Sequence, residues 1–177
     1  MRTLWTIVVA VALGAVACGR GGDIVDPNGN GGTPVLNGLA LTAQVIEVEH
    51  EMTSVIQVTM RVTLTNTTDA PIVRSYPAGC PVLMRFYHSL DLSLAYDEGR
   101  RPCSVTTPVS FSVQPQESIT LTSGLRFPWE ILGDSLGSGA YYAAALLRVT
   151  GINPIEVDAG VYAIPHCEQV GIQTVCN

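Results

Sequence analysis

The sequence predicts an all-β protein, built as a single antiparallel β-sandwich of about seven to nine strands. Between Ile56 and Thr65 apolar and polar residues alternate with a period of two, as in a strand with one buried face. Similar runs recur along the chain and are separated by turn-forming segments such as NTTDAP and QPQES. No segment shows a convincing apolar stripe with helical spacing. Many short strands without helices are typical of a β-sandwich.

Nine segments are expected to be strands. They are residues 39–48, 56–65, 71–75, 82–87, 92–97, 109–113, 118–125, 140–149 and 155–164. The run GAYYAAALLRV is rich enough in Ala and Leu for a helix, but it is short, follows GSG and has no helical stripe. We therefore expect it to be a buried strand. Roughly 140 residues suit one domain, which we place at residues 38–177.

Residues 1–17 have the parts of a secretory signal peptide. Arg2 is followed by an apolar run from Leu4 to Val16 and by the small residue Ala17. The run is shorter than the roughly 20 residues that a membrane-spanning helix needs, and no basic cluster follows it. We expect this segment to direct export and to be removed.

The stretch from Ala15 to Cys18 resembles the lipobox of bacterial lipoproteins, in which the cysteine is acylated and becomes the first residue. Because Ala15 stands where leucine is commonest, a plain signal peptide cleaved near Ala17 remains an alternative. The resemblance implies an anchor of several acyl chains, which gives lasting attachment. The expected location is the cell envelope, with the outer membrane or periplasmic face favoured because Gly19 is not an Asp retention signal.

Residues 18–37 are rich in Gly, Asn and Pro, so we expect a flexible tether. Within it, the segment from Asp26 to Gly31 matches the first half of a calcium loop, D-x-N-x-N-G. The twelfth position is Asn37 instead of the bidentate Glu, and no helical pattern flanks the loop. We therefore expect no metal here.

Four cysteines remain when Cys18 is set aside as the anchor, an even number in a chain addressed to an oxidising compartment. Their spacing favours two disulfides, Cys80 with Cys103 and Cys167 with Cys176. The rival interpretation is a metal site around His166 and Cys167. It lacks a Cys-x-x-Cys pair and a second histidine at ligand spacing, so a C-terminal disulfide clip is the preferred prediction.

Charge argues against nucleic acid as a partner. The chain has no lysine, and after removal of residues 1–17 its 8 Arg stand against 15 Asp and Glu, a net charge of −7. No basic stripe is available to neutralise phosphates. His50 and His88 have no partners at catalytic or ligand spacing, so no cofactor is expected.

The tetrapeptide Gly133 to Leu136 spells the motif of GDSL esterases, with Ser135 in the place of the nucleophile. In that family the serine follows an early strand, and the basic histidine belongs to an Asp-x-x-His motif. Here the motif lies late, and Ala163 precedes His166 by three residues. A turn in a Gly-Ser loop is the preferred interpretation, so we expect no enzyme.

The order of strands and turns resembles the domain named after the BsuPI intracellular proteinase inhibitor. The matching pieces are VTLTNTT with Pro71-Ile72, then Asp97-Glu98-Gly99, QPQES at residues 114–118, and Gly139-Ala140-Tyr141. The resemblance covers residues 56 to about 147. It implies an immunoglobulin-like sandwich, and inhibition of a protease by a loop is a possible function, although no inhibitory residues can be transferred.

These features together predict a lipid-anchored, non-catalytic binding or scaffolding module with an unknown protein partner in the envelope. Its variable loops would be YPAGCP, DEGRRPC and FPWEILGDSLGSG. The candidate binding residues in them are Tyr76, Arg100, Arg101, Phe127 and Trp129. Loop-mediated protease inhibition and, as a weaker alternative, esterase activity through Ser135 are the competing hypotheses.

Overall fold

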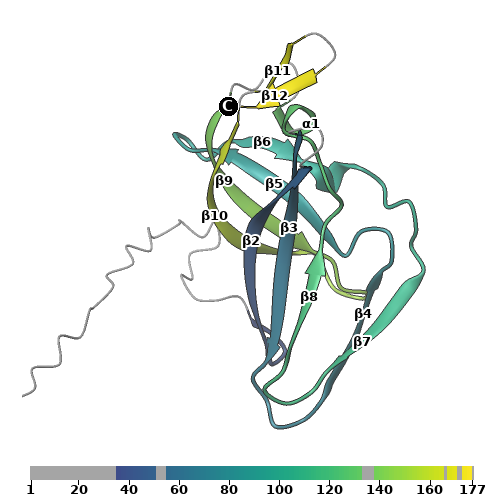
Figure 1. Ribbon diagram of the computed structural model, residues 1–177. Coiled ribbons are helices and arrows are strands. Elements are labelled where there is room, and N and C mark those ends of the chain that lie inside the picture. Colours follow the sequence, from purple (N-terminus) through teal and green to yellow (C-terminus); the bar gives the residue numbers. More distant parts are fainter. Residues whose placement is uncertain (1–34, 51–54, 133–137, 166, 171–172, 177) are drawn as a thin grey trace, which may run out of the picture. The chain divides into compact units, whose positions relative to one another are not determined.

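A computed structural model shows an antiparallel β-sandwich made of two four-stranded sheets (Figure 1). It describes residues 35–50, 55–132, 138–165, 167–170 and 173–176. Strands dominate these residues, and the sheets do not close into a barrel. The predicted fold class is therefore confirmed.

The first sheet has the strand order β1-β2-β3-β8. Its strands are β1 (Val35–Leu36), β2 (Leu39–His50), β3 (Val55–Asn66) and β8 (Ser118–Thr122). β2 pairs with β3 along its full length, from Leu39 opposite Asn66 to His50 opposite Val55. The alternation seen in the sequence places Val58, Met60, Val62 and Leu64 in the core, each fully buried.

The second sheet has the order β10-β9-β5-β6. Its strands are β10 (Ile155–Ile164), β9 (Gly139–Leu147), β5 (Val82–His88) and β6 (Leu94–Asp97). The ambiguous Ala-rich run is strand β9, as expected. It lies between β5 and β10, and its residues from Ala143 to Leu147 are all buried. Small and apolar side chains suit a central strand covered on both faces.

The chain alternates between the sheets in the order of an immunoglobulin-like sandwich. β2 and β3 lie in the first sheet, β5 and β6 in the second, β8 in the first again, and β9 and β10 in the second. The strand orders β2-β3-β8 and β10-β9-β5 match the A-B-E and G-F-C arrangements of that fold. The inward-facing side chains of both sheets, among them Met60, Met84, Phe86 and Leu147, form one core.

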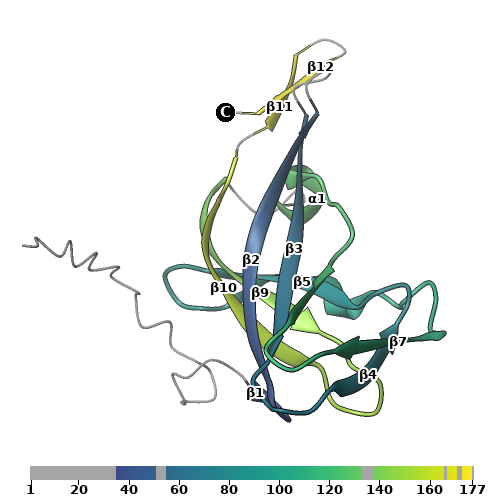
Figure 2. The same ribbon diagram turned by 60° about the horizontal axis from the view of Figure 1, so that its bottom comes forward.

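Six further elements among the described residues extend this framework. β4 (Ile72–Pro77) and β7 (Pro108–Val113) form a separate two-stranded ribbon (Figure 2). β11 (Cys167–Val170) and β12 (Gln173–Cys176) form a hairpin. A 3₁₀ turn, η1 (Glu98–Arg100), follows β6, and a one-turn helix, α1 (Pro128–Leu132), lies where a loop was expected. The described residues hold no helix that is long and apolar enough to cross a membrane.

The sheet begins earlier than the predicted domain boundary at residue 38. Leu36 lies in β1, is 6% exposed and pairs with Leu39. Asn37 and Gly38, both at positive φ, make the tight two-residue turn between β1 and β2, for which Asn-Gly is the preferred sequence. β1 therefore lies inside the segment, residues 18–37, that was predicted to be a tether.

Asn66 fixes the turn that follows β3. Its side chain is fully buried, and its amide nitrogen donates hydrogen bonds to the carbonyl oxygens of Ala70, at 2.8 Å, and Val113, at 2.9 Å. Its amide oxygen accepts hydrogen bonds from the backbone N–H and the hydroxyl of Thr68, both at 2.8 Å. This side chain therefore holds the start of the β4–β7 ribbon against the end of β3.

Replacing Asn66 by Ala is expected to lower the free energy of unfolding by about 2 to 4 kcal/mol, because it removes a partner from the buried carbonyl of Val113 and from the partly buried carbonyl of Ala70 and N–H of Thr68. Urea denaturation of the purified chain measures this. The matched control is Asn153→Ala, at an exposed position, which should stay within about 0.5 kcal/mol of the wild type. Equal stability of the two variants would contradict the structural role of Asn66.

Candidate functional site

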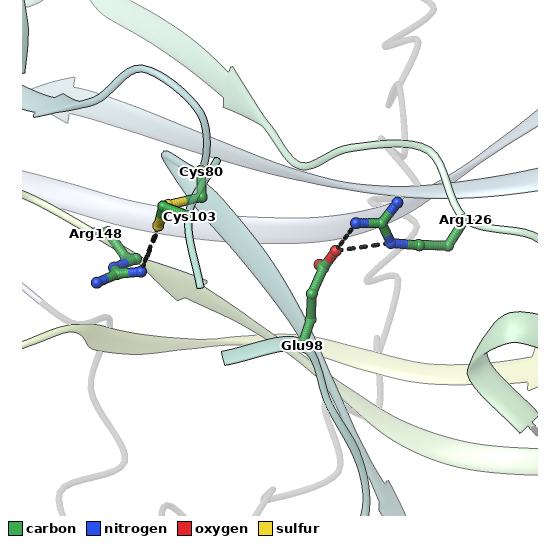
Figure 3. The surroundings of a disulfide bond; sticks show 5 residues. All are labelled: Cys80, Glu98, Cys103, Arg126 and Arg148. Carbon is green, nitrogen blue, oxygen red and sulfur yellow. Dashed lines mark hydrogen bonds and ion pairs between the residues drawn. A yellow bond between two sulfur atoms is a disulfide. The ribbon is translucent and has the colours of Figure 1, made fainter. Parts of the chain in front are cut away.

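Two of the predicted loops are joined into one surface. Cys80 and Cys103 form a disulfide between the segment after β4 and the segment after η1 (Figure 3). The same two segments are also joined by backbone hydrogen bonds. The N–H of Ala78 donates to the carbonyl of Thr107 at 3.0 Å, and the N–H of Gly79 donates to the carbonyl of Val105 at 2.9 Å. Residues 76–81 and 99–107 are called the joined-loop surface below.

Gly79 allows these two loops to approach closely. A Cβ atom at this position would lie 2.6 Å from the backbone nitrogen of Val105 and 2.9 Å from its carbonyl oxygen. A side chain at this position would therefore push the two loops apart. The Gly in YPAGCP is thus required by packing against the second loop.

The buried carboxylate of Glu98 fixes the start of the second loop, residues 99–107, to the sandwich. Glu98 is 1% exposed, and its Oε2 accepts a hydrogen bond from the backbone N–H of Met84 in β5 at 3.0 Å. Its Oε1 accepts one from Nε of Arg126 at 2.8 Å, and Nη2 of Arg126 lies 2.5 Å away (Figure 3). Burial opposes the charge on the Arg126 guanidinium, but the contact with Glu98 outweighs it and raises the pKa of Arg126.

A second polar network lies on the outer face of the β10-β9-β5-β6 sheet. Arg85 in β5 binds Asp97 at 3.0 Å and Glu156 at 2.7 Å, and the hydroxyl of Tyr87 donates to Glu156 at 2.7 Å. Burial, together with the hydrogen bond to Glu156, raises the pKa of Tyr87 to about 12. Asp97 also accepts from the N–H of Gly99 and so caps η1. The network connects three strands to the joined-loop surface.

The candidate binding residues fall into two groups. Arg100, Arg101 and Tyr76 belong to the joined-loop surface. The side chain of Arg100 is 78% exposed and lies 3.7 Å from Asp97, and Arg101 is also exposed. Tyr76 is half-buried, and its ring packs against that of Phe111.

Phe127 and Trp129 form a separate stacked pair at the start of α1. Their ring centroids are 4.2 Å apart, and the rings are nearly parallel at 9°. Trp129 is 40% exposed. The neighbouring Arg126 links this third loop to η1 through Glu98, but the described contacts of the two rings are with each other.

Other predicted sites lie partly or wholly outside the described residues. Cys18, Ser135 and the calcium-like segment 26–31 are outside them. Cys167 lies opposite Cys176 in the β11–β12 register, but their side chains are not described, so this pairing stays a prediction. The ring of His88 packs on that of Tyr141. Within the described ranges, no group of three or more potential metal ligands occurs.

Sequence reasoning did not find Arg85, Glu98, Glu156 or Arg126. Arg85 did carry a signal, because it is a charged residue between Met84 and Phe86 in an otherwise apolar strand. Glu98 carried none, because an acidic residue in the predicted loop DEGRRPC is expected to be exposed to solvent. The partners in the pairs Glu98–Arg126 and Arg85–Glu156 lie 28 and 71 positions apart in the sequence. Such pairs meet only in the folded chain.

Comparisons with known proteins give no family. No family model matches the chain, and no curated protein matches it. Among solved structures, a β-glucosidase from Erythrobacter marinus is similar over 68% of this chain and 15% of its own, with 13% identity and a TM-score of 0.30. A likeness that low supports no inference about fold or activity. The resemblance to the BsuPI-type domain stays a prediction.

Replacing Glu98 by Gln is expected to lower the free energy of unfolding by about 2 kcal/mol, because Arg126 and the N–H of Met84 lose a charged acceptor. Urea denaturation measures this, with the exposed Glu117→Gln as the control, expected within about 0.5 kcal/mol of the wild type. If Glu98→Gln were as stable as this control, the ion pair would not be what holds η1.

Proposed function

We propose that this protein is a lipid-anchored cell-envelope protein whose β-sandwich is a non-catalytic binding module. The joined-loop surface is its contact surface. The observation that carries the proposal is the fixation of two exposed loops by a disulfide, by two backbone hydrogen bonds and by the buried carboxylate of Glu98.

Fixed loops favour binding for an entropic reason. A partner that binds flexible loops loses affinity to the cost of ordering them, about 0.5 to 1.5 kcal/mol for each immobilised side chain. Here the backbone on both sides of the surface is already held in place. Loops carried on a rigid scaffold are also where binding residues commonly occur in sandwich folds.

The chemistry of the surface favours a protein partner that carries acidic groups. Arg100, whose side chain is 78% exposed, and Arg101, which is also exposed, supply two cations, and Val105, which is 45% exposed, adds an apolar side chain to the same surface. Arginine fits carboxylates with two parallel hydrogen bonds. An acidic face on the partner would complement these two cations.

Attachment to the membrane is supported by the stretch from Ala15 to Cys18 and by the Gly- and Asn-rich residues after it. A chain that carries lipid at Cys18 would place the sandwich near the membrane surface, on a tether of about 15 residues before β1 begins. Partners in the same envelope would then be at a high effective concentration.

Photo-crosslinking in the producing cells tests the contact surface. A photoreactive residue at Ser104, in the joined-loop surface, is expected to give a discrete cross-linked product. The same residue at Thr42, on the exposed side of β2, should not. Replacing Arg100 and Arg101 by Ser should reduce the product several-fold, whereas Arg74→Ser should not.

Equal cross-linked products from Ser104 and Thr42 would contradict the proposed contact surface.

Two activity assays distinguish the proposed binding module from the two alternative functions. If the purified chain inhibits a secreted protease at micromolar concentration, the function is inhibition. If it hydrolyses short-chain esters and Ser135→Ala abolishes this, the function is that of an esterase.

The anchor is tested by the intact mass of the detergent-extracted protein. We expect a chain that begins at Cys18 and is heavier by its acyl groups. Cys18→Ser should abolish the added mass and move the protein from the membrane fraction to the soluble fraction. An unacylated wild-type chain would remove the anchor from the proposal and leave the contact surface to be judged by crosslinking.

A further inference from the structure

The guanidinium group of Arg148 lies directly against the Cys80–Cys103 disulfide (Figure 3). Its Nη1 is 2.6 Å from Sγ of Cys103 and 3.5 Å from Sγ of Cys80. The backbone N–H of Arg148 donates to the carbonyl of Pro81 at 2.9 Å, which places this residue beside the chain that carries Cys80. A fixed cation next to sulfur lowers the pKa of a thiol and so stabilises the thiolate.

The two cysteines differ in their exposure to solvent. Cys80 is 6% exposed and packs with Leu83 and Leu146, whereas Cys103 is only partly buried against that cluster. A thiolate approaching from solvent therefore reaches Cys103 first. The thiolate that leaves is then Cys80. Its Sγ lies 3.5 Å from Nη1 of Arg148, farther than the 2.6 Å of Cys103 but still beside the cation.

We propose that this disulfide is a thiol–disulfide exchange site, with a thiol as its co-substrate. In the first step a thiolate attacks Sγ of Cys103, the Cys80–Cys103 bond breaks, and Cys80 leaves with the electron pair as a thiolate beside Arg148. In the second step another thiolate attacks the sulfur of the first reagent, and Cys103 leaves as a thiolate. Two thiols are oxidised to one disulfide, and the protein disulfide is reduced to two thiols.

The surrounding contacts allow the bond to open and close without loss of the fold. On one side the N–H of Arg101 donates to the carbonyl of Glu98 at 3.0 Å, and on the other the carbonyl of Val105 accepts from Gly79. The N–H of Cys80 donates to the carbonyl of Pro77 at 3.1 Å. These bonds do not involve the sulfurs, so both cysteines stay near each other after reduction. The inference does not depend on the partner proposed above.

Mass mapping of the wild-type chain tests the order of attack. The folded protein is exposed to reduced glutathione, and in a second arm to a reduced thioredoxin, and is then quenched with an alkylating agent. Cleavage after arginine separates Cys80, in residues 75–85, from Cys103, in 101–126, and from the two cysteines in 149–177. We expect glutathione on Cys103 and the first alkylation on Cys80. Glutathione mainly on Cys80 would overturn the proposal, and the ratio of rates in the two arms identifies the preferred class of thiol.

A second measurement tests the role of Arg148. In glutathione buffers of graded ratio, Arg148→Gln should shift the reduction equilibrium about tenfold toward the disulfide and slow the reduction, because the thiolate loses its cation. Arg148→Lys should stay close to the wild type, as should the control Arg74→Gln. Equal equilibria in wild type and Arg148→Gln would show that the disulfide is only structural. If Arg148→Gln does not fold, the wild-type mapping and the Lys variant still decide.

Discussion

The carboxylate of Glu98 joins the two sheets of the sandwich by polar contacts. One oxygen bonds the backbone of β5, in the second sheet, and the other bonds Arg126. The backbone of Arg126 pairs in turn with Val58 of β3, in the first sheet. Because this carboxylate is buried, its charge must be matched in place. The position of η1, and with it that of the second exposed loop, follows from that requirement.

The disulfide acts on the middle of the same loop. Glu98 fixes the start of the segment, Cys103 its middle, and the pairing of Val105 and Thr107 with the Ala78–Gly79 turn fixes its end. These contacts are short in range and differ in chemistry. A loop without regular secondary structure thereby acquires a defined shape beside the outer face of the sheet.

The parts of the fold that could be predicted are those encoded locally. The alternation from Ile56 to Thr65 specifies a strand and its buried face, and the turn residues mark where strands end. Leu92, by contrast, has a positive φ of 56° that its sequence does not signal, and β6 begins only at Leu94. The pairs Arg85–Glu156 and Glu98–Arg126 also escaped prediction. The first depends on strand order and register in a sheet, and the second joins η1 to the loop after β8, so both form only in the folded chain. The contact between Arg148 and the disulfide is of the same kind.

The turn after β3 bears on how the protein can be produced. Asn66, Thr67 and Thr68 spell the acceptor sequence for N-linked glycans. Both hydrogens of the Asn66 amide are already used inside the fold. In a eukaryotic secretory pathway a sugar would be attached to this nitrogen before folding is complete, and it would occupy space that the native turn needs. Secretion from such a host would therefore yield misfolded chains, whereas a host without this modification would not meet the obstacle.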